Sequence, residues 1–339
     1  MQSETESRIH QRQQNACFGR WQGRISTRGC QSMSEQSYRF PDSIEEVKRI
    51  LDRHGEEVTI VSGGQTLLPL VRDGTVELDH AVDISRIPAL TRIERRAEKT
   101  VIGSAVTYRD ILASEVGDRH SMLLETIEGI GDRQVRSLGT IGGALASGEP
   151  ALDIIPVLYC LDATVVIGSS DGTRRVDVGA LYRNATKETE LRGPREDYIG
   201  LAPVEIDSSE IIEAIEIPAT NDDGHHGEDY RKQTNVAGGW TISGVGTSVS
   251  LSPTRDRIDS ARVGLAAVGQ TGASAPTVET ALEGTPTTMQ EITKSVEQLG
   301  ADIDPTTTFV TSQYRLQVTK TLTSRSIAEA VTRAGGELE

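Results

Sequence analysis

The stretch Val58-Thr59-Ile60-Val61-Ser62-Gly63-Gly64-Gln65-Thr66 joins a β-branched run to a turn that carries almost no side chains. A second glycine turn, Gly139-Thr140-Ile141-Gly142-Gly143, follows about 75 residues later. Because glycine has no Cβ, such turns can bring consecutive backbone N–H groups close to phosphate oxygens. Either pair alone is also typical of an ordinary tight turn. Together they indicate a single extended ligand with a diphosphate in its middle.

The two commonest phosphate-binding motifs are missing from the chain. The nearest match to the G-x-G-x-x-G fingerprint, residues 129–134, lacks the third glycine and has no predicted strand before it. A Walker A loop with its lysine is also absent. The sequence therefore favours a different kind of dinucleotide site.

Composition limits the class of protein. A chain of 339 residues predicts two or three domains, and no run of 18 apolar residues predicts a membrane span. The 50 Asp and Glu outnumber the 35 Lys and Arg, of which only six are Lys, and this balance argues against nucleic-acid binding. An acidic surface poor in lysine is also typical of proteins kept soluble in high salt, so we expect a halophilic protein.

The first 32 residues differ from the rest. They hold five Arg against two acidic residues, whereas the remaining 307 carry 30 basic and 48 acidic groups, a net charge of −18. The leader lacks the continuous apolar core of a secretory signal. We expect residues 1–32 to be a disordered extension, or the product of a start codon assigned upstream of Met33.

The cysteines and histidines predict no metal site on this chain. Two cysteines lie in the leader, and Cys160 lies in an apolar run that predicts a buried helix. There is no C-x-x-C, which excludes the usual iron–sulfur and zinc motifs, and a body without a cysteine pair is typical of the cytoplasm. His225 and His226 fall in a polar stretch and are expected to be solvated, while the other histidines are isolated in the sequence. No nucleophile elbow or H-E-x-x-H motif is present, so the catalytic residues stay unknown.

Hydrophobic periodicity and turn signals predict three structured segments. Residues 33–90 contain helix, strand, glycine turn, helix and strand; residues 91–218 alternate short strands with two helices, near 107–115 and 150–161. Residues 219–228 are predicted to be a linker. Residues 229–335 are predicted to form a sheet up to residue 268, followed by helices.

Several motifs in order resemble one family. Ser62-Gly63-Gly64-Gln65-Thr66-Leu67-Leu68-Pro69, with the segments at 82–88, 102–107, 130–136, 138–143 and 150–153, is similar to the FAD-binding (medium) subunit of molybdenum hydroxylases. Relatives of this kind are the medium chain of aerobic carbon monoxide dehydrogenase and the flavin domain of xanthine dehydrogenase. Segments 230–232, 261–265 and 314–315 resemble the family's C-terminal domain, so the resemblance covers residues 35 to 335.

The resemblance implies an α+β fold, with two α/β subdomains of the PCMH type that enclose FAD and a small α+β domain after them. It also implies an electron-transfer role, with an iron–sulfur small subunit and a molybdopterin large subunit as partners. The acceptor would be NAD⁺ or a quinone. A stand-alone FAD-dependent oxidoreductase of the same superfamily is the alternative.

The resemblance also implies the cofactor-binding residues. In the family, the two glycine turns bind the diphosphate and ribityl region mainly through backbone N–H groups. Asp153 would accept hydrogen bonds from sugar hydroxyls, or it is simply a carboxylate of a helix turn. Lys232 matches a position near the flavin, and Ser104 and Ser147 are either ligands or turn residues. The predicted set is Ser62, Gly63, Gly64, Gln65, Thr66, Leu67, Ser104, Thr140, Ile141, Gly142, Gly143, Ser147, Asp153 and Lys232.

Three positions depart from the family pattern. Gln65 stands where a histidine is frequent, and both side chains can form hydrogen bonds. Ser137 replaces a frequent asparagine, which is a mild change. Gly239 precedes Trp240 where the family usually has an acidic residue, so the contribution of the C-terminal domain to flavin geometry is expected to differ.

Overall fold

We describe the protein from a computed structural model, which covers residues 37–74, 76, 78–182, 204–219, 224–236, 239–268, 273–302 and 310–338. The expectations for residues 1–32 and for a start at Met33 lie outside the described residues.

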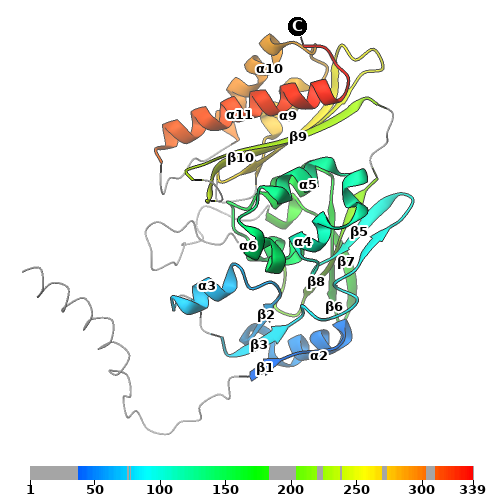
Figure 1. Ribbon diagram of the computed structural model, residues 1–339, viewed down its shortest axis with the longest axis vertical. Coiled ribbons are helices and arrows are strands. Elements are labelled where there is room, and N and C mark those ends of the chain that lie inside the picture. The colour runs from blue at the N-terminus through cyan, green and yellow to red at the C-terminus, as the bar shows by residue number, and fades with distance from the viewer. Residues whose placement is uncertain are drawn as a thin grey trace, which may run out of the picture. The chain divides into compact units, whose positions relative to one another are not determined.

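A small parallel sheet opens the described chain, with strand order β1–β3–β2. Helix α2 begins after Ser43, whose side chain accepts a hydrogen bond from the backbone N–H of Glu46, and it packs its apolar face on the sheet. The helix–strand–turn–helix–strand order predicted for this segment is confirmed, and Figure 1 shows it in blue. The elements are β1 (Ser37–Arg39), α2 (Ile44–His54), the 3₁₀ turn η1 (Gly55–Glu57), β2 (Val58–Val61), α3 (Leu67–Arg72) and β3 (His80–Asp83).

The second segment is built on an antiparallel sheet with strand order β4–β5–β8–β6–β7. Its strands are β4 (Ile93–Arg95), β5 (Lys99–Gly103), β6 (Thr164–Ser169), β7 (Gly172–Asp177) and β8 (Ile211–Pro218). Its helices are α4 (Tyr108–Leu112), α5 (Ser121–Glu128), α6 (Arg133–Leu138), α7 (Ile141–Ser147) and α8 (Ile154–Cys160), with 3₁₀ turns η2 (Glu115–Asp118) and η3 (Ala180–Tyr182).

The sequence predicted only α4 and α8 in this region. Helices α5, α6 and α7 are six to eight residues long. A helix of two turns shows too little of the 3.6-residue period to be read from hydrophobicity alone. Helices α5 and α7 form because they pack on the main core, where Ile127, Ile141 and Leu145 are fully buried. Helix α6 has no buried residue, and its N-cap Asp132 accepts the backbone N–H groups of Gln134 and Val135. Cys160 is buried as predicted, and this burial raises the pKa of its thiol.

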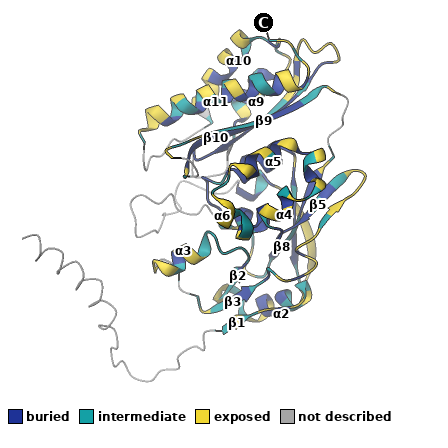
Figure 2. Ribbon diagram, viewed as in Figure 1, coloured by how far each residue is buried: buried dark blue, intermediate teal, exposed yellow. Residues whose placement is uncertain are grey.

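The third segment is an antiparallel sheet, β12–β11–β10–β9, with helices on one side. Figure 2 shows β10 buried along its length and exposed residues along the outer side of α11. Hydroxyl pairs join the two elements, with Ser243 Oγ 2.8 Å from Thr319 Oγ1 and Thr247 Oγ 2.8 Å from Ser326 Oγ. The elements are β9 (His226–Thr234), β10 (Thr241–Leu251), β11 (Ile258–Ala266), β12 (Ala273–Ser274), α9 (Pro276–Leu282), α10 (Met289–Val296), η4 (Glu297–Ala301) and α11 (Ser312–Arg333).

Strand β9 begins inside the stretch that the sequence predicted as a linker. His226 is a strand residue, and its Nε2 lies 3.0 Å from the buried carboxylate of Glu228, so it is not simply solvated as expected. The polar composition of residues 224–228 predicted a linker rather than a strand. The buried carboxylate of Glu228 is tolerated in the strand because His226 is its partner. The sheet predicted for residues 230–268 and the helices after it are confirmed.

Helix α8 joins the second and third segments. It packs on β10 and β11, where Gly264 leaves room for the backbone of Pro156, and a Cβ at that glycine would lie 2.5 Å from the Pro156 carbonyl oxygen. None of the helices in the described ranges combines the length and the apolar character needed to cross a bilayer.

Candidate functional site

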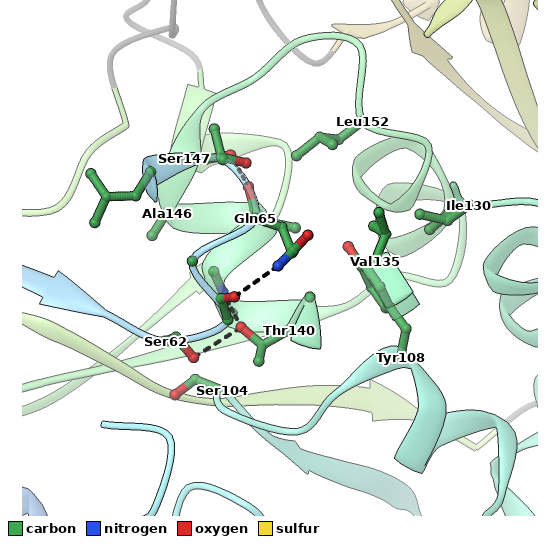
Figure 3. A pocket seen from close by; sticks show the side chains of 18 of the residues that line it. Ser62, Gln65, Ser104, Tyr108, Ile130, Val135, Thr140, Ala146, Ser147 and Leu152 are labelled. Carbon is green, nitrogen blue, oxygen red and sulfur yellow. Dashed lines mark hydrogen bonds between the residues drawn. The ribbon is translucent and has the colours of Figure 1, made fainter. Parts of the chain in front are cut away.

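The two glycine turns touch each other. Ser62, which follows β2, places its Oγ 2.9 Å from Oγ1 of Thr140, the N-cap of α7 (Figure 3). Gly63 lies directly against the carbonyl of Leu138, so closely that a Cβ could not be accommodated. The predicted convergence of the turns is therefore present in the structure, and it is a direct packing contact.

The first turn is shaped to face a ligand. Gly64 has φ = 67°, a left-handed conformation that favours glycine, and its carbonyl accepts the N–H of Leu68 at 3.0 Å. Thr66, the N-cap of α3, makes no side-chain capping bond to the first turn of the helix. The Gln65 amide folds back toward the Gly63 carbonyl at 3.4 Å, and Figure 3 shows it in the middle of the site.

The second turn uses its N–H groups within the protein. The amide of Ile141 donates to Val106 O at 3.2 Å, that of Gly142 donates to Ser104 O at 2.9 Å, and that of Gly143 donates to Thr140 Oγ1 at 3.2 Å. These three donors are therefore already engaged, contrary to the expectation that this turn binds a diphosphate mainly through backbone N–H groups. Its glycines allow close packing instead.

Both turns line a cavity of about 710 Å³, a volume within the usual range for cofactor sites. All three segments contribute to it, including the start of α8 and strand β9. Thirteen of the fourteen residues predicted from the sequence line this cavity: Ser62, Gly63, Gly64, Gln65, Thr66, Leu67, Ser104, Thr140, Gly142, Gly143, Ser147, Asp153 and Lys232. The exception is Ile141, whose side chain is fully buried in the core.

Asp153 is at the centre of a hydrogen-bond network. Its carboxylate accepts bonds from Tyr230 Oη at 2.6 Å, Thr241 Oγ1 at 2.7 Å and Lys232 Nζ at 2.6 Å. Lys232 Nζ also donates to the carbonyl of Gly129 at 2.7 Å. Burial together with the Asp153 charge raises the pKa of Tyr230. These three protein donors fill most of the acceptor sites of the carboxylate, so Asp153 holds Lys232 at the cavity.

Sequence reasoning missed most of the apolar wall. Ile130, Val135 and Leu152 line the cavity, as Figure 3 shows, and so does Trp240, directly before β10. Tyr108 is 4% exposed, and Figure 3 shows its hydroxyl directed into the site. Burial, and then the Asp153 charge, raises the pKa of Tyr108, so it is a neutral hydrogen-bond donor at neutral pH. The position of Tyr108 directly after the 102–107 motif was the one sequence signal that could have identified it as a site residue.

Comparison with known proteins identifies the family. Residues 32–220 match the FAD binding domain in molybdopterin dehydrogenase, and residues 228–330 match the CO dehydrogenase flavoprotein C-terminal domain. The chain belongs to this family of FAD-binding subunits, and the resemblance inferred from the motifs is confirmed.

Relatives with established names agree. The chain is 26% identical to the glyceraldehyde dehydrogenase medium chain of Sulfolobus acidocaldarius, over 87% of this chain and 98% of the relative. It is also 26% identical to the carbon monoxide dehydrogenase medium chain of Afipia carboxidovorans, over 88% and 97%. The reconstituted CO dehydrogenase from Oligotropha carboxidovorans superposes with a TM-score of 0.77 at 26% identity, covering 88% of this chain and 98% of that one. The predicted fold class is confirmed.

The residues at the site fit FAD. The Oγ of Ser104 is buried at the cavity and has no hydrogen-bond partner among the described residues, so it can serve a polar ligand. The apolar wall suits a flat ring system, while Gly64 and the start of α3 suit a diphosphate. The observed cavity therefore matches both halves of a dinucleotide.

Proposed function

We propose that the chain is the FAD-carrying electron-transfer subunit of a heteromeric molybdenum-containing hydroxylase or dehydrogenase. In this role it takes electrons from an iron–sulfur subunit and passes them to an external acceptor such as NAD⁺ or a quinone. The observation that carries the proposal is the convergence of two glycine turns and the Asp153–Lys232 pair on one cavity within a domain of this family.

The residues have distinct tasks in this proposal. Gly64, Gln65 and Thr66 would hold the diphosphate, because the N–H groups of the second turn, at residues 141–143, are already bonded within the protein. Ser104 Oγ would donate to a polar atom of the cofactor. Lys232, fixed by Asp153, would place a positive charge at the cavity. The flavin, when bound, supplies the redox chemistry.

The partner subunits are inferred from the relatives. Two of them are named medium chains, and another is the 6-hydroxypseudooxynicotine dehydrogenase complex subunit alpha of Paenarthrobacter nicotinovorans. Each name describes one component of a larger enzyme. By the same logic, we propose an iron–sulfur small subunit and a molybdopterin large subunit as partners, with the substrate bound on the large one.

The test is purification from the native host through a C-terminal tag. We expect about one FAD per chain in the visible absorption spectrum and two further subunits, one with iron–sulfur clusters and one with molybdenum. A chain that carries no flavin and purifies alone would contradict the proposal. A purified, flavin-loaded chain that turns over a substrate without partners would instead support the stand-alone oxidoreductase.

Two further parts of the proposal concern the cellular compartment and the salt conditions in which the protein works. The free, buried Cys160 agrees with a cytoplasmic protein. The acidic, lysine-poor composition agrees with adaptation to salt. We therefore expect the melting temperature to rise between low and molar salt, and a constant melting temperature would argue against salt adaptation.

A further inference from the structure

Two histidines that are 26 positions apart in the sequence meet at the end of the parallel sheet opposite the glycine turn. His54 ends α2, and His80 begins β3, where it is in register with Val58 of β2 and Ser37 of β1. The glycine turn follows Val61, at the other end of the same strands. Figure 1 shows α2 and the three strands together at the lower end of the view.

The two histidine rings and one carboxylate form a compact cluster. The ring centroids of His54 and His80 are 4.9 Å apart. One ligand atom from each of His54, Glu57 and His80 lies within 4.8 Å of the others. The sequence treated these histidines as isolated, and the fold places them side by side.

A hydrogen bond to Ser37 orients the His80 ring. Its Nδ1 is 2.7 Å from Ser37 Oγ, and its Nε2 is 3.9 Å from Glu57 Oε2. When a histidine binds a metal through one ring nitrogen, its other nitrogen is usually held by a hydrogen bond in this way. The Nε2 of His80 is therefore directed at the cluster with its second nitrogen already satisfied.

His54 has a polar atom that its protein surroundings leave unsatisfied. Its Nε2 is buried, and it has no hydrogen-bond partner within the described ranges. A buried polar atom without a partner is destabilising, and such atoms call for a specific explanation. The tilted ring contact with His80 does not satisfy a nitrogen lone pair or an N–H group. A bound cation would satisfy this nitrogen.

We propose that His54, His80 and Glu57 bind a divalent transition-metal ion of the Zn²⁺ class. Two imidazole nitrogens and one carboxylate oxygen are a ligand set that suits Zn²⁺ and leaves one coordination position for water. Tetrahedral ligands on Zn²⁺ lie about 3.3 Å apart. Reaching that spacing requires small rotations of the three side chains, of which that of Glu57 is 68% exposed.

The ion has a structural role. It joins the end of α2, the 3₁₀ turn η1 and the start of β3, and through Ser37 it also engages β1. It lies away from the cavity, because His54, Glu57 and His80 are not among the residues that line it. Metal binding therefore supports the sheet that carries the first glycine turn, and it does not depend on the proposed function.

The experiment is titration of the full-length, chelator-treated protein with Zn²⁺ by isothermal calorimetry, with Mg²⁺ as the hard-cation control. A Cys17→Ser/Cys30→Ser background removes binding by the leader cysteines. We expect one Zn²⁺ per chain, a melting temperature raised by a few degrees, and no response to Mg²⁺. His54→Gln and His80→Gln should each weaken Zn²⁺ binding at least tenfold, and Glu57→Gln should weaken it severalfold.

Matched controls separate the site from general surface binding. Glu56→Gln changes the neighbouring exposed carboxylate and should leave the affinity unchanged. Substitution of Co²⁺ should give visible absorption bands that disappear in His54→Gln. Replacement of a merely structural histidine would leave these bands unchanged. Unchanged Zn²⁺ affinity in both histidine variants would overturn the proposal, and so would no Zn²⁺ binding by the unsubstituted protein. Urea unfolding of each variant and flavin content verify that the chain remains folded.

Discussion

The first glycine turn, residues 62–66, and the second, residues 139–143, contain the same Gly-Gly dipeptide and do different work. In the first, Gly64 adopts a left-handed conformation at the cavity. In the second, Gly142 lies in α7 with its N–H bonded to Ser104 O and no space for a side chain. Both turns line the cavity, but Gly64 is required for its left-handed backbone, whereas Gly142 forms a tight joint with the backbone of Ser104. A glycine pair thus has two physical uses, and only its neighbours decide between them.

The joint should respond most strongly to mutation. In Gly142→Ala, the new Cβ would lie 2.6 Å from the Ser104 carbonyl oxygen and 2.8 Å from Ser104 Cα, and backbone cannot move as a flexible side chain can. We expect a loss of about 3 kcal/mol or more in the free energy of unfolding, measured by urea denaturation. Gly300→Ala, where nothing lies within 4 Å, is the control and should change stability by less than about 0.5 kcal/mol. Equal stability of the two variants would show that the joint is not tight.

Acid should weaken the core that carries the second turn. Burial lowers the pKa of His120, which lies against that core, from 6.5 to about 4. The unfolded chain therefore binds more protons than the folded one below pH 6.5. The contribution of His120 is present above that pH and is lost as the pH falls toward 4, by roughly 3 kcal/mol in total.

Urea midpoints measured from pH 7 to pH 4 test the histidine. His120→Gln should show a flatter pH profile than the native chain over this interval. His225→Gln, in the third segment, is the comparison variant. If the dependence of stability on pH were as steep in His120→Gln as in the native chain, the acid sensitivity would belong to other groups.

The network at Asp153 ties the cavity to the third segment. Asp153→Asn keeps the shape but removes the charge that faces Lys232, whose side chain is 20% exposed. We expect about 2 kcal/mol of destabilisation together with a lower FAD content, because Lys232 loses its anchor. Asp162→Asn breaks the more exposed pair with Arg262 and should cost less than about 1 kcal/mol. Full FAD content in Asp153→Asn would separate the network from cofactor binding.

Substitution of Gly64 should change the free energy of unfolding least and should weaken FAD binding strongly. Gly64→Ala places a side chain at φ = 67°, which costs about 1–2 kcal/mol, and its Cβ meets only the flexible end of Leu68. We expect FAD binding to weaken at least tenfold, measured by fluorescence titration of the flavin-free protein. Gly74→Ala has similar backbone strain, at φ = 80°, but lies outside the cavity, so it should retain FAD. Equal FAD affinity in the two variants would remove the first turn from the site.

Local patterns predicted much of the architecture. The hydrophobic periodicity of residues 33–90 and the β-branched strand before Gly63 were enough to order the first segment. The pattern of residues 230–268 likewise predicted the third sheet. The short helices α5 and α7 could not be predicted in the same way, because they are stabilised by the core around them and not by their own periodicity.

The sequence by itself determined the family, the fold class and the glycine and polar residues predicted at the cavity, since these follow from motifs and hydrophobic patterning. Tertiary structure alone decided how those residues act. It engaged the donors of the second turn, turned Ile141 into the core, bound Asp153 to Lys232 and brought His54 beside His80. The physical reason is that hydrogen bonds and packing join atoms that are distant in the chain, and no local pattern specifies which partner each atom will find.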